Sequence, residues 1–139
     1  MLLDLKSDIK VTQLLAPVGR AAGAVNGAAL PLNGYGSVAF VFGFGGLTGG
    51  TAAIKLQESD DGSTNWTDVA AERLNGALDA AVANTPQVVG LTEVTALAKA
   101  FVRPVVTITG GTALECAVYA VQGNPKVSPV GDDGSVYIA

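Results

Sequence analysis

The chain has 139 residues, a formal net charge of −4, one cysteine and no histidine. This length fits one domain with a single core, and the lone Cys116 cannot form an internal disulfide, so we expect it to be a small buried hydrophobe. Without histidine and with only 14% charged residues, the chain lacks the commonest general base, the commonest metal ligand and the basic stripe of a nucleic-acid-binding protein.

A long uncharged stretch raises the question of a membrane span. Residues 21–54 carry no charge, which is enough length for a transmembrane helix. Five glycines between positions 43 and 50 argue against a continuous helix there. At the N-terminus, Asp4 stands where a signal peptide needs basic residues and an unbroken apolar core. We therefore expect no membrane contact and no secretion by a signal peptide.

Along the chain, apolar residues repeat mainly with the period of two that is typical of β-strands. Within Ser37–Phe44 the large side chains share one face, and within Ala52–Glu58 apolar residues alternate with Lys55 and Gln57. The predicted strands are, in chain order, Ile9–Leu15, Gly27–Leu32, Ser37–Phe44, Ala52–Glu58, Trp66–Val69, Gln87–Leu91, Phe101–Thr109 and Ala113–Val121. The helical patterns at Ala70–Leu74 and Glu93–Ala100 are too short to be stable alone, so we expect connecting turns there.

Two hairpins are predicted between neighbouring strands. The first joins Ser37–Phe44 to Ala52–Glu58 through the glycine-rich segment Gly45–Gly50. The second joins the last two strands through Gly110 and Gly111, and places their apolar side chains in one layer. These side chains are Val102, Val106 and Ile108 opposite Leu114, Cys116, Val118 and Ala120. Because proline cannot donate a ladder hydrogen bond, Pro104 predicts that its strand lies at a sheet edge or carries a bulge.

Eight short strands separated by turn signals predict an all-β fold, an antiparallel β-sandwich or barrel of jelly-roll-like type. After Gly123 the regular pattern stops, since prolines, glycines and aspartates dominate the remaining residues. We therefore expect an N-terminal arm with the first strand over residues 1–16, a β-sandwich domain over residues 17–123 and a C-terminal arm over residues 124–139.

The most distinctive stretch is Lys55–Val69, which predicts a strand, a tight polar turn and a return strand anchored by Trp66. Ser59, Asp61 and Trp66 match the Asp-box hairpin of sialidase-like propellers, but the chain has no internal repeat from which a propeller could be built. A calcium site through Asp60, Asp61 and Asp68 is an alternative, although the loop lacks EF-hand spacing. Solvated turn carboxylates are the simpler interpretation.

No catalytic pair emerges from the remaining polar residues. The glycine-rich loop after residue 43 has no following lysine and opens no helix, so it is not a phosphate-binding loop. Serines and threonines have no histidine to activate them, and no carboxylate lies in an evident apolar pocket. We therefore expect a protein that is not an enzyme and that needs no cofactor and no metal.

Several segments together carry a resemblance. These are Ile9–Pro17, Leu32–Val38, the hairpin Lys55–Val69, Phe101–Val106 and Gly123–Lys126. They resemble small structural proteins of tailed phages and gene-transfer agents, which are typically encoded near the major capsid gene. The resemblance implies a capsid decoration, or cement, protein that binds the lattice of the major capsid protein on the exterior of the virion and is assembled in the bacterial host cytoplasm. It also implies a homo-oligomer, often a trimer.

From this we predict that the two arms carry the contacts between subunits, because terminal arms can add strands to a neighbour or clamp it. The predicted partner-binding residues are Leu5, Ile9, Val11, Leu14, Pro125, Val127, Val136 and Ile138. Two alternatives stay open: a head-tail connector or tail component, and a glycan-binding module built around Trp66 and Asp61.

Overall fold

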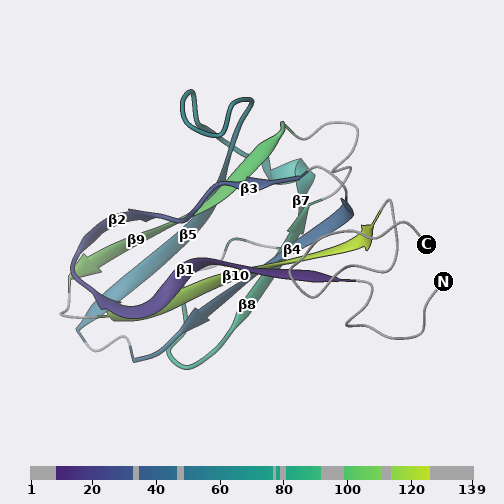
Figure 1. Ribbon diagram of the computed structural model, residues 1–139. Helices are drawn as coiled ribbons and strands as arrows, with labels where there is room; N and C mark the ends of the chain where they lie inside the picture. Colours follow the sequence, from purple (N-terminus) through teal and green to yellow (C-terminus); the bar gives the residue numbers. More distant parts are fainter. Residues whose placement is uncertain are drawn as a thin grey trace.

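The computed structural model describes residues 9–32, 35–46, 49–76, 78, 81–91, 99–110 and 114–125. These residues form two antiparallel β-sheets that pack face to face as an open sandwich (Figure 1). The strands are β1 (Lys10–Arg20), β2 (Gly23–Asn26), β3 (Leu30–Pro31), β4 (Tyr35–Phe44), β5 (Gly50–Ser59), β6 (Thr67–Asp68), β7 (Leu74–Asn75), β8 (Gln87–Leu91), β9 (Phe101–Gly110) and β10 (Leu114–Pro125). The predicted all-β, antiparallel β-sandwich is confirmed, and the barrel alternative is excluded.

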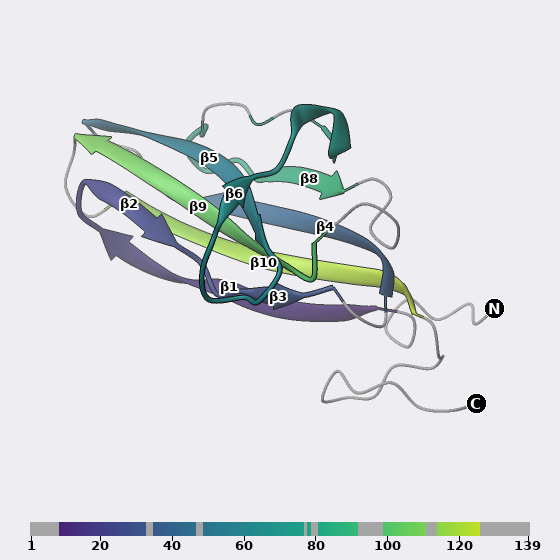
Figure 2. The same cartoon turned by 90° about the horizontal axis from the view of Figure 1, so that it is seen from above.

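Consecutive strands repeatedly change sheet. Sheet A has the order β1-β10-β4-β8-β7, and sheet B has the order β2-β9-β5-β6, with β3 also paired to β9. Figure 2 shows, from above, the long strands of the two layers running along one another, as in aligned sandwiches. No helix among the described residues is long and apolar enough to cross a membrane.

The core lies between the inner faces of the two sheets. Phe40 and Phe42 from β4 and Val102 and Val106 from β9 have no exposed surface. All four large side chains of the Ser37–Phe44 pattern are buried, as the period of two predicted, since alternate residues of a strand point to opposite faces. Cys116 belongs to the same core, and its burial raises the pKa of the thiol, as expected for an inert cysteine.

The hairpin predicted within Lys55–Val69 is confirmed by the antiparallel pairing of β5 with β6, whereas the two hairpins predicted through glycine-rich loops are wrong. β4 pairs with β10 and β8 in sheet A, whereas β5 pairs with β9 and β6 in sheet B. In the same way β9 and β10 belong to different sheets. The apolar faces that were expected side by side in one layer instead meet across the core, because each glycine-rich connection crosses between sheets.

Two strands were not predicted, β2 and β7, which raises the number from eight to ten. β1 is also longer than expected: it continues to Arg20 and pairs with β10 through the expected domain boundary at residue 16. Its register shifts twice, between Gln13 and Leu15 and between Leu15 and Val18. Residues 70–74 form a connecting turn with one 3-10 segment, Ala71–Arg73, and most of 93–100 lies outside the described residues.

The strand that contains Pro104 does not lie at a sheet edge, so the expectation of an edge strand is wrong. β9 is an interior strand, bordered by β5 on one side and by β2 and β3 on the other. The segment opposite Pro104 carries one extra residue, since Asn26 faces Val105 and Leu30 faces Val102. There Gly27 donates its backbone hydrogen bond to the Pro104 carbonyl, 2.8 Å away, and a Cβ on Gly27 would lie 2.5 Å from Pro104 Cγ. The bulge expected from Pro104 therefore lies in the neighbouring segment, between Asn26 and Leu30, and not in β9 itself.

Candidate interaction surfaces

The outer face of sheet A is built from apolar and small side chains that the register places in rows. We call this surface the apolar face. Its first row is Val11, Val121, Ala39 and Gly90, its second row is Gln13, Tyr119, Val41 and Val88, and its third row is Ala117 and Gly43. Val11 is 57% exposed and Val88 is 59% exposed, although both are large and hydrophobic. Exposed apolar surface of this extent is typical of an interaction site.

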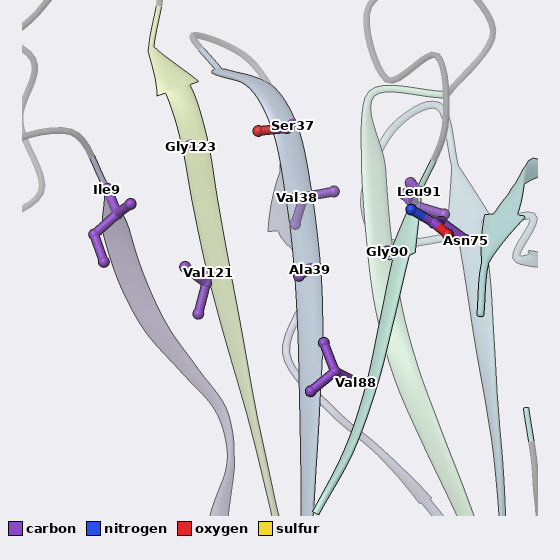
Figure 3. A pocket seen from close by; sticks show the side chains of 10 residues that line it. All are labelled: Ile9, Ser37, Val38, Ala39, Asn75, Val88, Gly90, Leu91, Val121 and Gly123. Carbon is purple, nitrogen blue, oxygen red and sulfur yellow. The ribbon is translucent and has the colours of Figure 1, made fainter. Parts of the chain in front are cut away.

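A shallow hollow of about 450 Å³ lies on the apolar face, at the end of the sandwich where β1 begins and β10 ends. Figure 3 shows its lining residues, which come from β4, β7, β8 and β10 of sheet A and from Ile9, the residue before β1. They are Ile9, Ser37, Val38, Ala39, Asn75, Val88, Gly90, Leu91, Val121 and Gly123. The hollow exists because Ala39, Gly90 and Gly123 bring little or no side chain between Val121 and Val88. Among the described residues that line it, none is ionisable.

The outer face of sheet B is polar, and we call it the polar face. Arg103 donates hydrogen bonds to Gln57 Oε1 from Nε (3.1 Å) and Nη2 (2.9 Å). Gln57 in turn donates to Asp68 at 3.1 Å, and Lys55 lies 3.3 Å from the same carboxylate oxygen. The hydrogen bond from Gln57 holds the pKa of Asp68 below its ordinary value, with Lys55 contributing in the same direction. The Arg103 guanidinium also stacks on Trp66, 4.2 Å from the ring centroid.

The loop after β5 is held by Ser59 and Asp61, two of the residues that match the Asp-box pattern. Asp61 Oδ1 accepts hydrogen bonds from the backbone amides of Ser63 and Thr64, and Oδ2 accepts one from the Thr64 hydroxyl. Ser59 Oγ accepts from the amide of Gly62 at 3.2 Å and lies 2.5 Å from the Thr64 carbonyl oxygen. The hydrogen bonds that Asp61 accepts, from the Thr64 hydroxyl first and then from the amides of Thr64 and Ser63, hold the pKa of its carboxyl far below the ordinary value.

The Asp61 carboxylate therefore serves its own loop. No group of three or more histidine, cysteine or carboxylate side chains among the described residues is arranged to hold a metal ion. For the glycan alternative, one face of the Trp66 ring is covered by Arg103, and the carboxylate that would bind sugar hydroxyls is already bonded to the loop.

A buried ion pair supports the sheet B side of the sandwich. Arg73 Nη1 donates to both carboxylate oxygens of Glu58, at 2.6 and 2.7 Å, and the side chains are only 13% and 9% exposed. The backbone amide of Lys99 also donates to Glu58, at 3.3 Å. The pair thus holds two segments against β5, the 3-10 turn that contains Arg73 and the backbone at Lys99, two residues before β9. This role is structural.

The predicted partner-binding residues fall into four groups. Ile9 lines the hollow and Val11 lies on the apolar face, so both are available for contact. Leu14 is 5% exposed and belongs to the core, so its side chain is used inside the fold. Pro125 ends β10 opposite Tyr35. The others, Leu5, Val127, Val136 and Ile138, lie outside the described residues and stay predictions.

The sequence reasoning missed most of the apolar face, including Val41, Val88 and Tyr119. A signal was present in β4, where the residues between the large side chains are Ala39, Val41 and Gly43 and none is polar. A strand that is apolar on both faces is typical of one covered on both sides.

No protein-family model matches the sequence, and no curated protein matches it. Solved structures do match. The PBSX exported protein XepA is similar with a TM-score of 0.56 and 13% identity, over 100% of this chain and 50% of the XepA chain. VP2 of infectious bursal disease virus, in the crystal structure of its subviral particle, is similar with a TM-score of 0.50 and 8% identity, over 93% of this chain and 34% of VP2. The likeness establishes the fold. This chain spans half the length of XepA and about a third of VP2.

Proposed function

We propose that this protein is a structural component of a tailed-phage virion, which decorates and stabilises the capsid shell by binding the lattice of the major capsid protein. The observation that carries the proposal is the pairing of Lys10 with Gln122, because it brings the beginning and the end of the described chain to the same end of sheet A (Figure 1). Residues 1–8 and 126–139 continue from there. Both predicted arms therefore start from one small region beside the hollow.

The reach of these segments supports contact with a repeating surface. An extended chain covers at most about 3.3–3.6 Å per residue, so residues 126–139 can span up to about 50 Å. That is more than the length of a ten-residue strand such as β4, about 33 Å. Several weak contacts to a lattice then add up to stable attachment without a deep binding pocket. A rigid sandwich with no catalytic role suits this function, and VP2 offers a precedent for the fold in a viral particle.

Binding to empty shells, assembled from a major capsid protein of a tailed phage, tests the proposal. The full chain should co-sediment with the shells. A double substitution in the tail, Val136→Asp with Ile138→Asp, should weaken binding at least about tenfold, since it places charges at two predicted apolar contacts. Val130→Asp, in the same tail but outside the predicted contact set, is the matched control and should bind like the unchanged protein.

Two results would count against the proposal: no binding of the full chain to the shells, or equal binding by the double variant. An electron-microscopy map of the particle tests the position separately. Density on the faces of the shell supports decoration, whereas density at the portal or tail assigns the chain to the head-tail connector or tail.

A further inference from the structure

We propose that the apolar face of sheet A is the contact between two copies of this chain, packed face to face about a two-fold axis. The inference does not depend on the proposed capsid function. Its first support is chemical. Among the described residues, the only charged side chain that the register places on this face is Glu115, and it lies at one end of β10. The polar face on the other sheet carries Lys55, Asp68 and Arg103.

A second support is the glycines on the apolar face. A Cβ on Gly43 would meet its nearest neighbour, the Ala117 carbonyl oxygen, at 3.9 Å, and one on Gly90 would meet the Val38 carbonyl oxygen at 3.4 Å. The fold therefore has room for side chains at both positions, in contrast to Gly27. Glycine weakens a strand, and within a strand it often marks a place where another backbone approaches closely. A low, flat surface is the shape that a second sheet requires.

The area of the apolar face fits a dimer. The four strands that carry its rows each occupy about 4.8 Å of the sheet, which gives a width of roughly 19 Å, and the nine residues from Glu115 to Gly123 give a length of roughly 27 Å. Each copy would then bury roughly 500 Å², and the pair roughly 1,000 Å², which reaches the lower limit of specific interfaces. The apolar face is thus large enough to form a dimer interface by itself.

A second copy is the occupant that this chemistry favours. A two-fold interface brings one surface against itself, so it must be self-complementary. An apolar sheet whose one described charge, Glu115, lies at one end meets that condition without any matching of charges, even for a chain with a net charge of −4. Two sheets pack about 10 Å apart with their strands nearly aligned. A two-fold axis that crosses the strands near Tyr119 places the two copies of Glu115 at opposite rims, where both stay in water.

The test is the mass of the full-length protein in solution, by light scattering after size exclusion, at concentrations up to about 100 µM, because interfaces of this size commonly bind in the micromolar range. We expect twice the 13.9 kDa of one chain. Val88→Lys should raise the dissociation constant at least about tenfold, since it places two like charges in the interface. Thr107→Lys adds the same charge to the exposed polar face of sheet B and should leave the dimer unchanged.

Gly90→Val provides a second measurement that does not introduce a charge. It fills the hollow of the apolar face, so it should weaken the dimer, while the melting temperature of the isolated chain should stay the same or rise. An unchanged protein of one or three chain masses, or a Val88→Lys variant that dimerises like the unchanged protein, would overturn the inference. A dimer that forms only after residues 126–139 are deleted would also overturn the inference. That result would mean that the protein's own tail covers the apolar face in the full-length chain. Capsid binding that persists in a monomeric variant leaves the proposed function intact.

Discussion

The two outer faces of the sandwich differ although both sheets contribute their inner faces to one core. On the polar face, Lys55, Gln57 and Arg103 form a connected set of hydrogen bonds and charge pairs. On the apolar face, the outward positions hold mostly valine, alanine and glycine, together with Gln13 and Tyr119. The inner faces follow the same alternation in both sheets, so folding alone does not explain this difference. The outward residues of sheet A are the ones that our inference assigns to the contact with a second copy.

The largest expected effect is a difference in the free energy of unfolding between substitutions on the inner and outer sides of β4. In the Val88→Lys background, which we expect to be monomeric, Phe42→Ala should lower the free energy of unfolding by about 3–5 kcal/mol, because it leaves a cavity in the core. Val41→Ala, one residue away on the apolar face, should cost about 1 kcal/mol or less. Urea unfolding measures both. Equal losses would mean that the apolar face already belongs to the interior of the single chain.

A somewhat smaller effect is expected for the buried carboxylate of the sheet B side. Glu58→Gln should lower the free energy of unfolding by about 3 kcal/mol, since it removes the charge that faces the buried Arg73 guanidinium. Glu115→Gln, at the exposed end of the apolar face, is the matched control and should change stability by less than about 0.5 kcal/mol. A loss below about 1 kcal/mol for Glu58→Gln would show that the pair is not needed to fasten the turn.

The loop after β5 predicts a dependence on pH. The pKa of Asp61 is lowered in the folded chain, so the stabilisation from its ionised form is complete above the unfolded pKa, about 3.9, and is lost as the pH falls below that value. Asp61→Asn should therefore flatten the fall of the melting temperature between about pH 4 and pH 2. Asp60→Asn, in the same loop, should keep the original profile. A parallel profile for Asp61→Asn would contradict this role of its carboxylate.

The smallest effect is expected for the most exposed ion pair of the polar face. The side chains of Lys55 and Asp68 are 44% and 64% exposed, so Lys55→Gln should change the free energy of unfolding by less than about 1 kcal/mol. The oligomeric state should not change at all. If Lys55→Gln altered the mass in solution, the polar face would have to be included in self-association, and the contrast between the two faces would disappear.

The sequence predicts which residues are buried far better than it predicts which strands pair. The period of two in β4 identifies Val38 and Phe40 as core residues because it reflects local backbone geometry. Pairing is not local. The connection after Phe44 is short enough for a hairpin, yet it is also long enough to cross to a sheet about 10 Å away, and only the partners of each strand decide between the two. The same limit explains the second wrong hairpin, between β9 and β10.

The candidate site was predicted only in its outline. Ile9 and Val11 were identified through the expected role of an N-terminal arm, and the structure places both beside the apolar face. Val88 and Tyr119 could not be grouped with them, because they lie far apart in the sequence and meet only through the order β1-β10-β4-β8. A face assembled from four strands is visible only when the strand order is known.

The irregular edge strand β1 has a consequence for how copies of this chain assemble. Its register shifts twice against β10, and Pro17 lies within the second shift. Bulges and proline at a sheet margin hinder the addition of a foreign strand, which is how β-proteins avoid growing into fibrils. When strand addition at this edge is hindered, copies of the chain associate through the proposed two-fold contact of the apolar face instead. Such a contact is complete with two copies, so the assembly has a fixed size.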